Sequence, residues 1–169
     1  MTTLDPSRYP EPVAGLLRRL PLAPLGPGTP VRSERAALEA LDDSVPIACR
    51  AGLWLAFDFL DESHVISQDL HTTEGSYWHA LMHRREPDFW NSKYWFRQVG
   101  THPLFADLAK AAELGHPSSG AWDPFAFVDA CERAIGKGGP EEERCRRVQR
   151  AEWELLFAWC FAAGVARGS

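Results

Sequence analysis

Histidines are concentrated in one part of the chain. Five of the six histidines, namely His64, His71, His79, His83 and His102, fall between residues 64 and 102. Imidazole binds metal ions in its neutral form and exchanges protons near pH 7, so such a cluster is typical of a metal centre or of acid–base catalysis. Tryptophan, tyrosine and arginine are interleaved with these histidines, and ligand sites combine apolar walls with polar groups in this way. We therefore expect a functional site within residues 64–102.

Three polar residues recur at helical spacing in this region. His79, His83 and Glu86 stand at positions i, i+4 and i+7, so a helix places them on one face, opposite an apolar face. Two imidazoles one turn apart can bind one metal ion, and the carboxylate can be a third ligand or orient a ring. The spacing allows a divalent metal ion without specifying which one, with His71 or His64 as a further ligand. The same three residues could instead be catalytic acid–base groups that need no metal.

Two other interpretations of this stripe remain open. A polar stripe opposite an apolar stripe is also what the solvent side of a surface helix looks like. Alternatively, the histidines are structural and form hydrogen bonds between helices. The motif differs from the H-E-x-x-H of zinc proteases, because Ala80 and Leu81 follow His79 where a glutamate would stand.

A second group of residues could hold a ligand. Lys93 and Arg97 are one turn apart on an expected helix, and aromatic residues flank them. Cationic groups can bind a carboxylate or phosphate while neighbouring rings stack on a planar group, so we predict an anionic small molecule. In the structural alternative, Lys93 and Arg97 neutralise Glu86 and Asp88. The candidate ligand-binding residues are Arg84, Trp90, Lys93, Tyr94 and Arg97.

Arg84 and Arg85 fall on or beside the apolar face of the expected helix that carries His79 and His83. A buried guanidinium is costly unless a carboxylate is paired with it. Asp58 has the complementary problem, because it lies within the apolar run LWLAFDFL. We therefore predict that Asp58 or Asp61 forms an ion pair with Arg84 or Arg85.

Helix-start and helix-stop signals recur along the chain, whereas no alternating β-branched run bounded by hairpin turns is present. Asp88 and Asp123-Pro124 are typical helix starts, and Gly100 and Gly136 are typical stops. These signals predict an all-α fold, a single irregular helical domain of about six or seven helices covering residues 31–169. The expected helices cover residues 33–41, 44–59, 74–86, 89–99, 101–115, 124–135 and a last segment from 140.

The first 30 residues are rich in proline and leucine. They contain seven of the 13 prolines, which excludes a long helix there. The leucines are unlike a solvated linker, so we expect an N-terminal arm packed on the domain. An arm that crosses a second copy would give a homodimer. The alternative function is therefore a non-enzymatic interaction or ligand-binding module that uses this arm.

Composition excludes several classes of protein. The net charge of −5 argues against a nucleic-acid-binding protein. The longest apolar stretch, from Trp153 to Val165, is too short to span a bilayer, and no secretory signal is evident, so we expect a cytoplasmic address and no membrane partner. Motifs for dinucleotide binding, the P-loop and the α/β-hydrolase elbow are absent. The sequence predicts a small helical protein with a His/Arg/Trp-lined site and does not decide whether it is an enzyme.

Overall fold

The computed structural model describes residues 4–113 and 121–167, and within these ranges the chain is helical without any strand. This confirms the predicted all-α class. The described residues form nine α-helices and two short 3-10 helices, Pro6–Arg8 and Arg32–Glu34. The α-helices are α1 (Val13–Arg18), α2 (Arg35–Glu39), α3 (Ile47–Ala56), α4 (Leu60–Asp69), α5 (Thr73–Arg85), α6 (Phe89–Val99), α7 (Leu104–Glu113), α8 (Pro124–Ala134) and α9 (Pro140–Arg167).

Two of these α-helices, α1 and α4, were not predicted. The single helix expected over residues 44–59 ends at Ala56, because Asp58 adopts a φ of 65° and stops it. Aspartate tolerates this left-handed conformation better than most residues do. A new helix, α4, then starts at Leu60. The predicted end of another helix at Gly115 lies outside the described residues.

Side-chain caps are present at the starts of α5 and α6. The Thr72 side chain accepts a hydrogen bond from the Gly75 backbone N–H at 3.0 Å and begins α5. The Asp88 side chain accepts a hydrogen bond from the backbone N–H of Asn91 at 3.1 Å and begins α6. These caps satisfy backbone donors that a helix start leaves without partners, so they fix where each helix begins.

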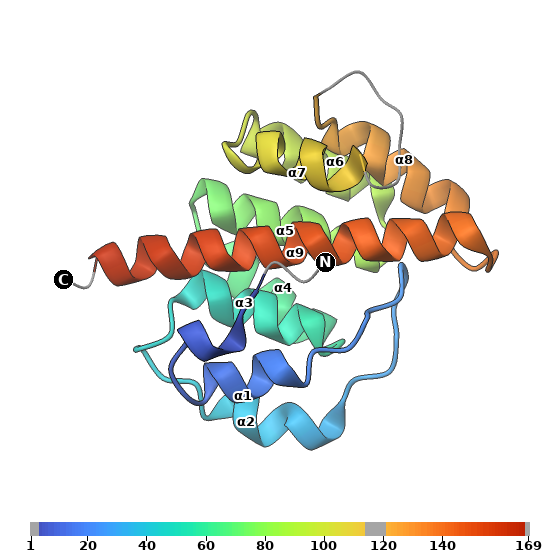
Figure 1. The fold of residues 1–169 in the computed structure, drawn as a ribbon. Helices are drawn as coiled ribbons and strands as arrows, with labels where there is room; N and C mark the ends of the chain where they lie inside the picture. The colour runs from blue at the N-terminus through green and yellow to red at the C-terminus, as the bar shows by residue number, and fades with distance from the viewer. Residues whose placement is uncertain (1–3, 114–120, 168–169) are drawn as a thin grey trace.

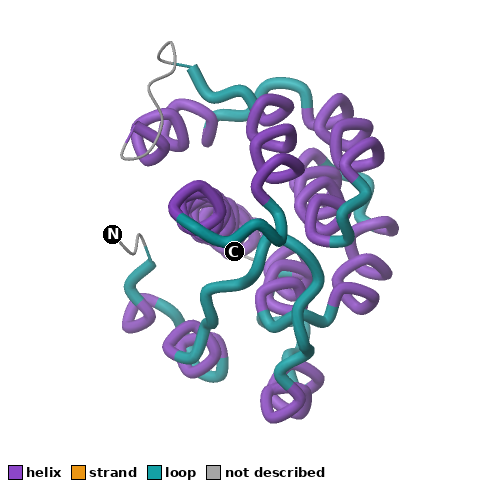
Figure 2. The backbone as a smooth tube through the Cα atoms, turned by 90° about the vertical axis from the view of Figure 1, so that its right-hand side faces the viewer, coloured by secondary structure: helices purple, strands orange, loops and turns teal. Residues whose placement is uncertain are grey.

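The longest helix, α9, runs through the middle of the fold (Figure 1). Helices α6, α7 and α8 lie on one side of it, and α1 and α2 lie on the other. Figure 2 looks nearly along α9 and shows shorter helices around much of its circumference. Trp153, Leu156 and Phe157 of α9 are buried in the core. None of the described helices, including the 28-residue α9, is both long and apolar enough to cross a membrane.

Residues of the N-terminal arm contact α9. Between α1 and Val31 the arm carries no helix and crosses α9, whose polar side chains bind its carbonyl oxygens. Arg150 donates to Pro21 O at 2.9 Å, and Gln149 donates to Pro24 O at 3.0 Å. Proline-rich backbone has few N–H groups for secondary structure, so these side chains give its carbonyl groups partners.

Candidate metal centre

Three histidines from two neighbouring helices converge on one point. His64 lies on α4, and His79 and His83 lie one turn apart on α5. One ring nitrogen from each imidazole lies within 4.8 Å of the other two. The three-residue connection from Leu70 to Thr72 keeps α4 and α5 adjacent, and the two helices make one of the most extensive helix contacts in the fold. His64 thus joins the pair that sequence spacing had brought together.

Burial separates the three interpretations of the polar stripe. The exposed fractions of His79 and His83 are 3% and 7%. The solvent-face interpretation is therefore wrong, because α6 covers this side of α5. Trp95 of α6 stacks on the His79 ring, with 4.0 Å between ring centroids and 17° between planes. His64 is only half-buried, so the cluster is closest to solvent on the α4 side.

The ring nitrogens of His79 are buried without hydrogen bonds. Neither Nδ1 nor Nε2 has a partner among the described residues. This does not fit a structural histidine that bridges two helices, because buried polar groups nearly always find a partner. His83 differs, since its Nδ1 lies 3.1 Å from Oε2 of Glu86. That contact fixes the His83 ring and leaves its Nε2 as the atom that could bind a metal.

The two histidine rings of α5 are poised to remain neutral at pH 7. Burial, and then the nearby rings of His83 and His64, lowers the pKa of His79 from 6.5 to about 3. Burial also lowers the pKa of His83, although the charge of Glu86 opposes the shift. A neutral imidazole has a free lone pair, which is the form that binds a metal ion. A group with a pKa near 3 is by contrast a weak general base at neutral pH.

Acid should destabilise the fold through these histidines. Between pH 6.5 and about 3 the unfolded chain binds a proton at His79 that the folded chain does not, so stability is lost as the pH falls. The loss from His79 alone has a slope of about 1.4 kcal/mol per pH unit. Urea unfolding between pH 7 and pH 4 measures this slope. The His79→Phe variant should show a slope shallower by about one proton; equal slopes would contradict the assignment.

The other predicted metal ligands lie outside the cluster. Glu86 is exposed just after α5, and it contacts His83 without being among the converging groups. His71 is exposed in the connection before α5 and is not among the converging groups. His102, the remaining histidine of residues 64–102, is buried elsewhere, and its Nδ1 accepts a hydrogen bond from the backbone N–H of Leu104 at 3.2 Å.

The predicted ion pairing of the buried arginines is confirmed for one of them. Arg85 pairs with Asp58, as expected from the charge within the apolar run. Arg84 instead pairs with Glu152 of α9, with 2.6 Å between Nη2 and Oε2 and no exposure of either side chain. Helical periodicity puts Arg84 and Arg85 on the side of α5 away from His79. Arg84 therefore does not line the histidine cluster.

Among the candidate ligand residues of α6, one forms an ion pair with α8 and the others lie on the exposed surface. Lys93 pairs with Asp129 of α8. Trp90 is 71% exposed and stacks on Tyr94, whose ring in turn has the Arg97 guanidinium 5.9 Å from its centroid. Trp95, which was not among the predicted ligand residues, is the α6 residue that stacks on a cluster histidine.

Comparison of the chain with family models, with curated proteins and with solved structures finds no match. The chemistry of the cluster therefore follows from its own residues. These are three imidazoles from α4 and α5, one carboxylate that orients a ring, and an aromatic wall. The chain thus has a candidate three-histidine metal centre, and its family is not assigned.

Proposed function

We propose that this protein binds a divalent transition-metal ion, with Zn²⁺ the first candidate, through His64, His79 and His83. The observation that carries the proposal is the convergence of three ring nitrogens within 4.8 Å, one of them on a buried ring without hydrogen bonds. Imidazole is a preferred ligand of zinc, copper, iron and nickel, whereas magnesium and calcium prefer oxygen.

The cluster has to contract slightly to hold an ion. Zinc–nitrogen bonds of about 2.0–2.1 Å at tetrahedral angles put ligand nitrogens about 3.4 Å apart. A separation of up to 4.8 Å in the metal-free cluster therefore requires movement of about 1 Å, which side-chain rotation can supply. His79 and His83 are stacked, with 15° between ring planes, and binding would turn the rings apart.

Three histidine ligands leave a further coordination position open. In zinc proteins this pattern is typical of catalytic sites, where the open position holds water or substrate. Three neutral ligands also leave the full charge of the ion uncompensated, which favours an anionic small molecule as the substrate. Because His64 is the half-buried member, access would come from the α4 side. We infer metal-assisted chemistry on a small anion, with Glu86 as a positioning residue for His83.

A metal titration tests the proposal. Calorimetric titration of metal-free protein with Zn²⁺, and the visible absorption of Co²⁺ in a tetrahedral nitrogen site, should both show one ion per chain. His64→Gln should weaken binding by at least about 100-fold, because it removes one of three ligands. His71→Gln is the matched control, since His71 is exposed and outside the cluster. Equal affinities for the two variants, or no saturable binding, would overturn the proposal.

A further inference from the structure

A second site candidate lies on the opposite side of α5. A small cavity of about 30 Å³, partly open to solvent, is lined by Leu20, Pro21 and Ala23 of the arm and by residues of α3, α5 and α9. A single water needs roughly 10–15 Å³ of such volume, so the cavity admits more than one water and excludes a nucleotide or a sugar phosphate. Its side chains are separate from those of the histidine cluster.

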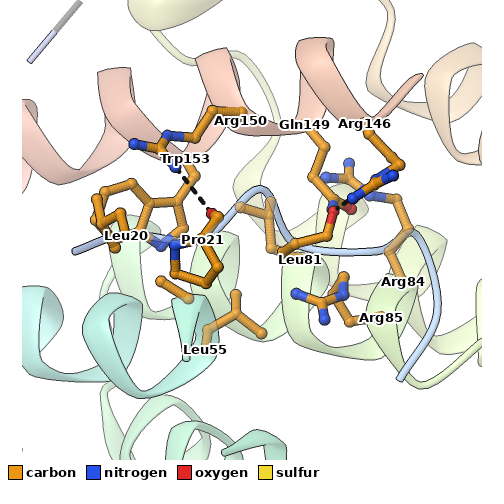
Figure 3. A pocket seen from close by; sticks show the side chains of 12 residues that line it. Leu20, Pro21, Leu55, Leu81, Arg84, Arg85, Arg146, Gln149, Arg150 and Trp153 are labelled. Atoms are coloured by element: carbon orange, nitrogen blue, oxygen red, sulfur yellow. Dashed lines mark hydrogen bonds between the residues drawn. The ribbon is translucent and has the colours of Figure 1, made fainter. Parts of the chain in front are cut away.

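The walls of the cavity are divided by polarity. Figure 3 shows Leu20, Leu55 and Trp153 toward one end, where the Arg150 guanidinium is bonded to Pro21 O, while Arg84 and Arg146 lie toward the other end with Gln149 beside them. A site with an apolar end and a cationic end fits a short molecule that carries a negative charge at one end.

The cationic end contains buried donors without partners. Arg84 is fully buried, and only its Nη2 has a hydrogen bond, to Glu152. Its Nε and Nη1 have no hydrogen-bond partner among the described residues, and its Cζ lies 4.7 Å from the centroid of the Phe127 ring. Guanidinium donors are rarely left in this state, and an anionic oxygen is a strong acceptor for them.

The charge around the cavity leaves one positive unit in excess. Arg84 pairs with Glu152, and the other two ion pairs of the lining are Arg85–Asp58 and Arg150–Glu154. Arg146 forms no ion pair within the described residues and donates instead to the carbonyl oxygens of Leu22 and Ala23, at 2.8 Å and 3.2 Å. A monoanion would balance this charge.

We propose that this cavity binds a short-chain carboxylate of the size of acetate or propionate. The carboxylate accepts a hydrogen bond from a free N–H of Arg84 and is attracted by Arg146. The alkyl end contacts Leu55 and Trp153. The arm closes the cavity over the ligand, so binding ties residues 20–23 more tightly to α9. The proposal does not depend on the metal centre, because it uses the other face of α5.

Propionate is the probe. Saturable stabilisation of the full chain by sodium propionate is expected in thermal unfolding, measured against sodium chloride at equal ionic strength. Propionamide has the same shape without the charge and should have no effect. No saturation up to about 50 mM propionate, or equal stabilisation by propionamide, would overturn the proposal.

Two variant pairs locate the binding. Ala23→Leu fills the cavity from the arm and should weaken propionate binding by at least about tenfold, whereas Ala36→Leu, at an exposed site of α2, should not. Arg146→Gln removes the excess charge and should also weaken binding, while Arg147→Gln, on the exposed side of the same helix, should not. Circular dichroism verifies the fold of each variant. Equal propionate affinities within either pair would contradict the assignment.

Discussion

The Arg84→Met variant should be about 3–5 kcal/mol less stable than the wild-type protein in urea unfolding. The guanidinium is fully buried, and its removal leaves the Glu152 carboxylate charged and without its cation. One hydrogen bond to Glu152 would remain, from the Tyr77 hydroxyl at 3.0 Å. A single neutral donor does not compensate a buried charge. This is the largest stability effect that we expect from any single polar substitution.

The double variant Arg84→Met/Glu152→Gln tests the cause. Glutamine removes the stranded charge and keeps an oxygen that can accept from Tyr77, so much of the lost stability should return. Arg147→Met is the matched control, because Arg147 forms an exposed ion pair with Glu143 on the same central helix. It should cost less than about 1 kcal/mol. The pair is not a buried structural contact if Arg84→Met loses no more stability than this control. The same holds if the loss of stability in the double variant equals the sum of the losses in the two single variants.

Local signals in the sequence were sufficient for much of the fold. Capping residues such as Thr72 and Asp88 have side chains that satisfy backbone donors at a helix start, and they do so wherever the rest of the chain lies. Spacing along α5 was likewise sufficient to bring His79 and His83 to one face. The ion pair of Asp58 with Arg85 was predictable because a charge within an apolar run requires a partner.

The remaining parts of the site depend on contacts between distant segments. His64 was only one of two suggested extra ligands, because α4 has a polar sequence with a weak apolar stripe and was not predicted as a helix. Glu152 is 68 residues away from Arg84, and no local pattern connects them. The burial of His79 depends on Trp95, which reaches it only after α6 has packed on α5. Periodicity fixes which residues share a face and does not fix what covers that face.

Replacing His79 with phenylalanine should stabilise the metal-free protein and abolish metal binding. Both ring nitrogens of His79 are buried without partners, and leaving such groups unsatisfied costs about 1–3 kcal/mol each. Phenylalanine keeps the stacking on Trp95 and has no polar atoms. Its slightly larger ring offsets part of the gain through crowding, so we expect a net gain of about 1 kcal/mol without metal.

Zinc should reverse this order of stability. At a concentration 100 times its dissociation constant, the ion stabilises the wild-type fold by about 2.7 kcal/mol. The stability of a variant that cannot bind the ion does not change. The wild-type protein should therefore be less stable than His79→Phe in the presence of a chelator and more stable than it in the presence of Zn²⁺. His102→Phe is the matched control: His102 is equally buried, but its Nδ1 accepts a hydrogen bond from Leu104 N. That variant should lose stability and retain the full stabilisation by zinc. If His79→Phe responds to zinc as wild type does, His79 is not a metal ligand, and its unsatisfied nitrogens need another explanation.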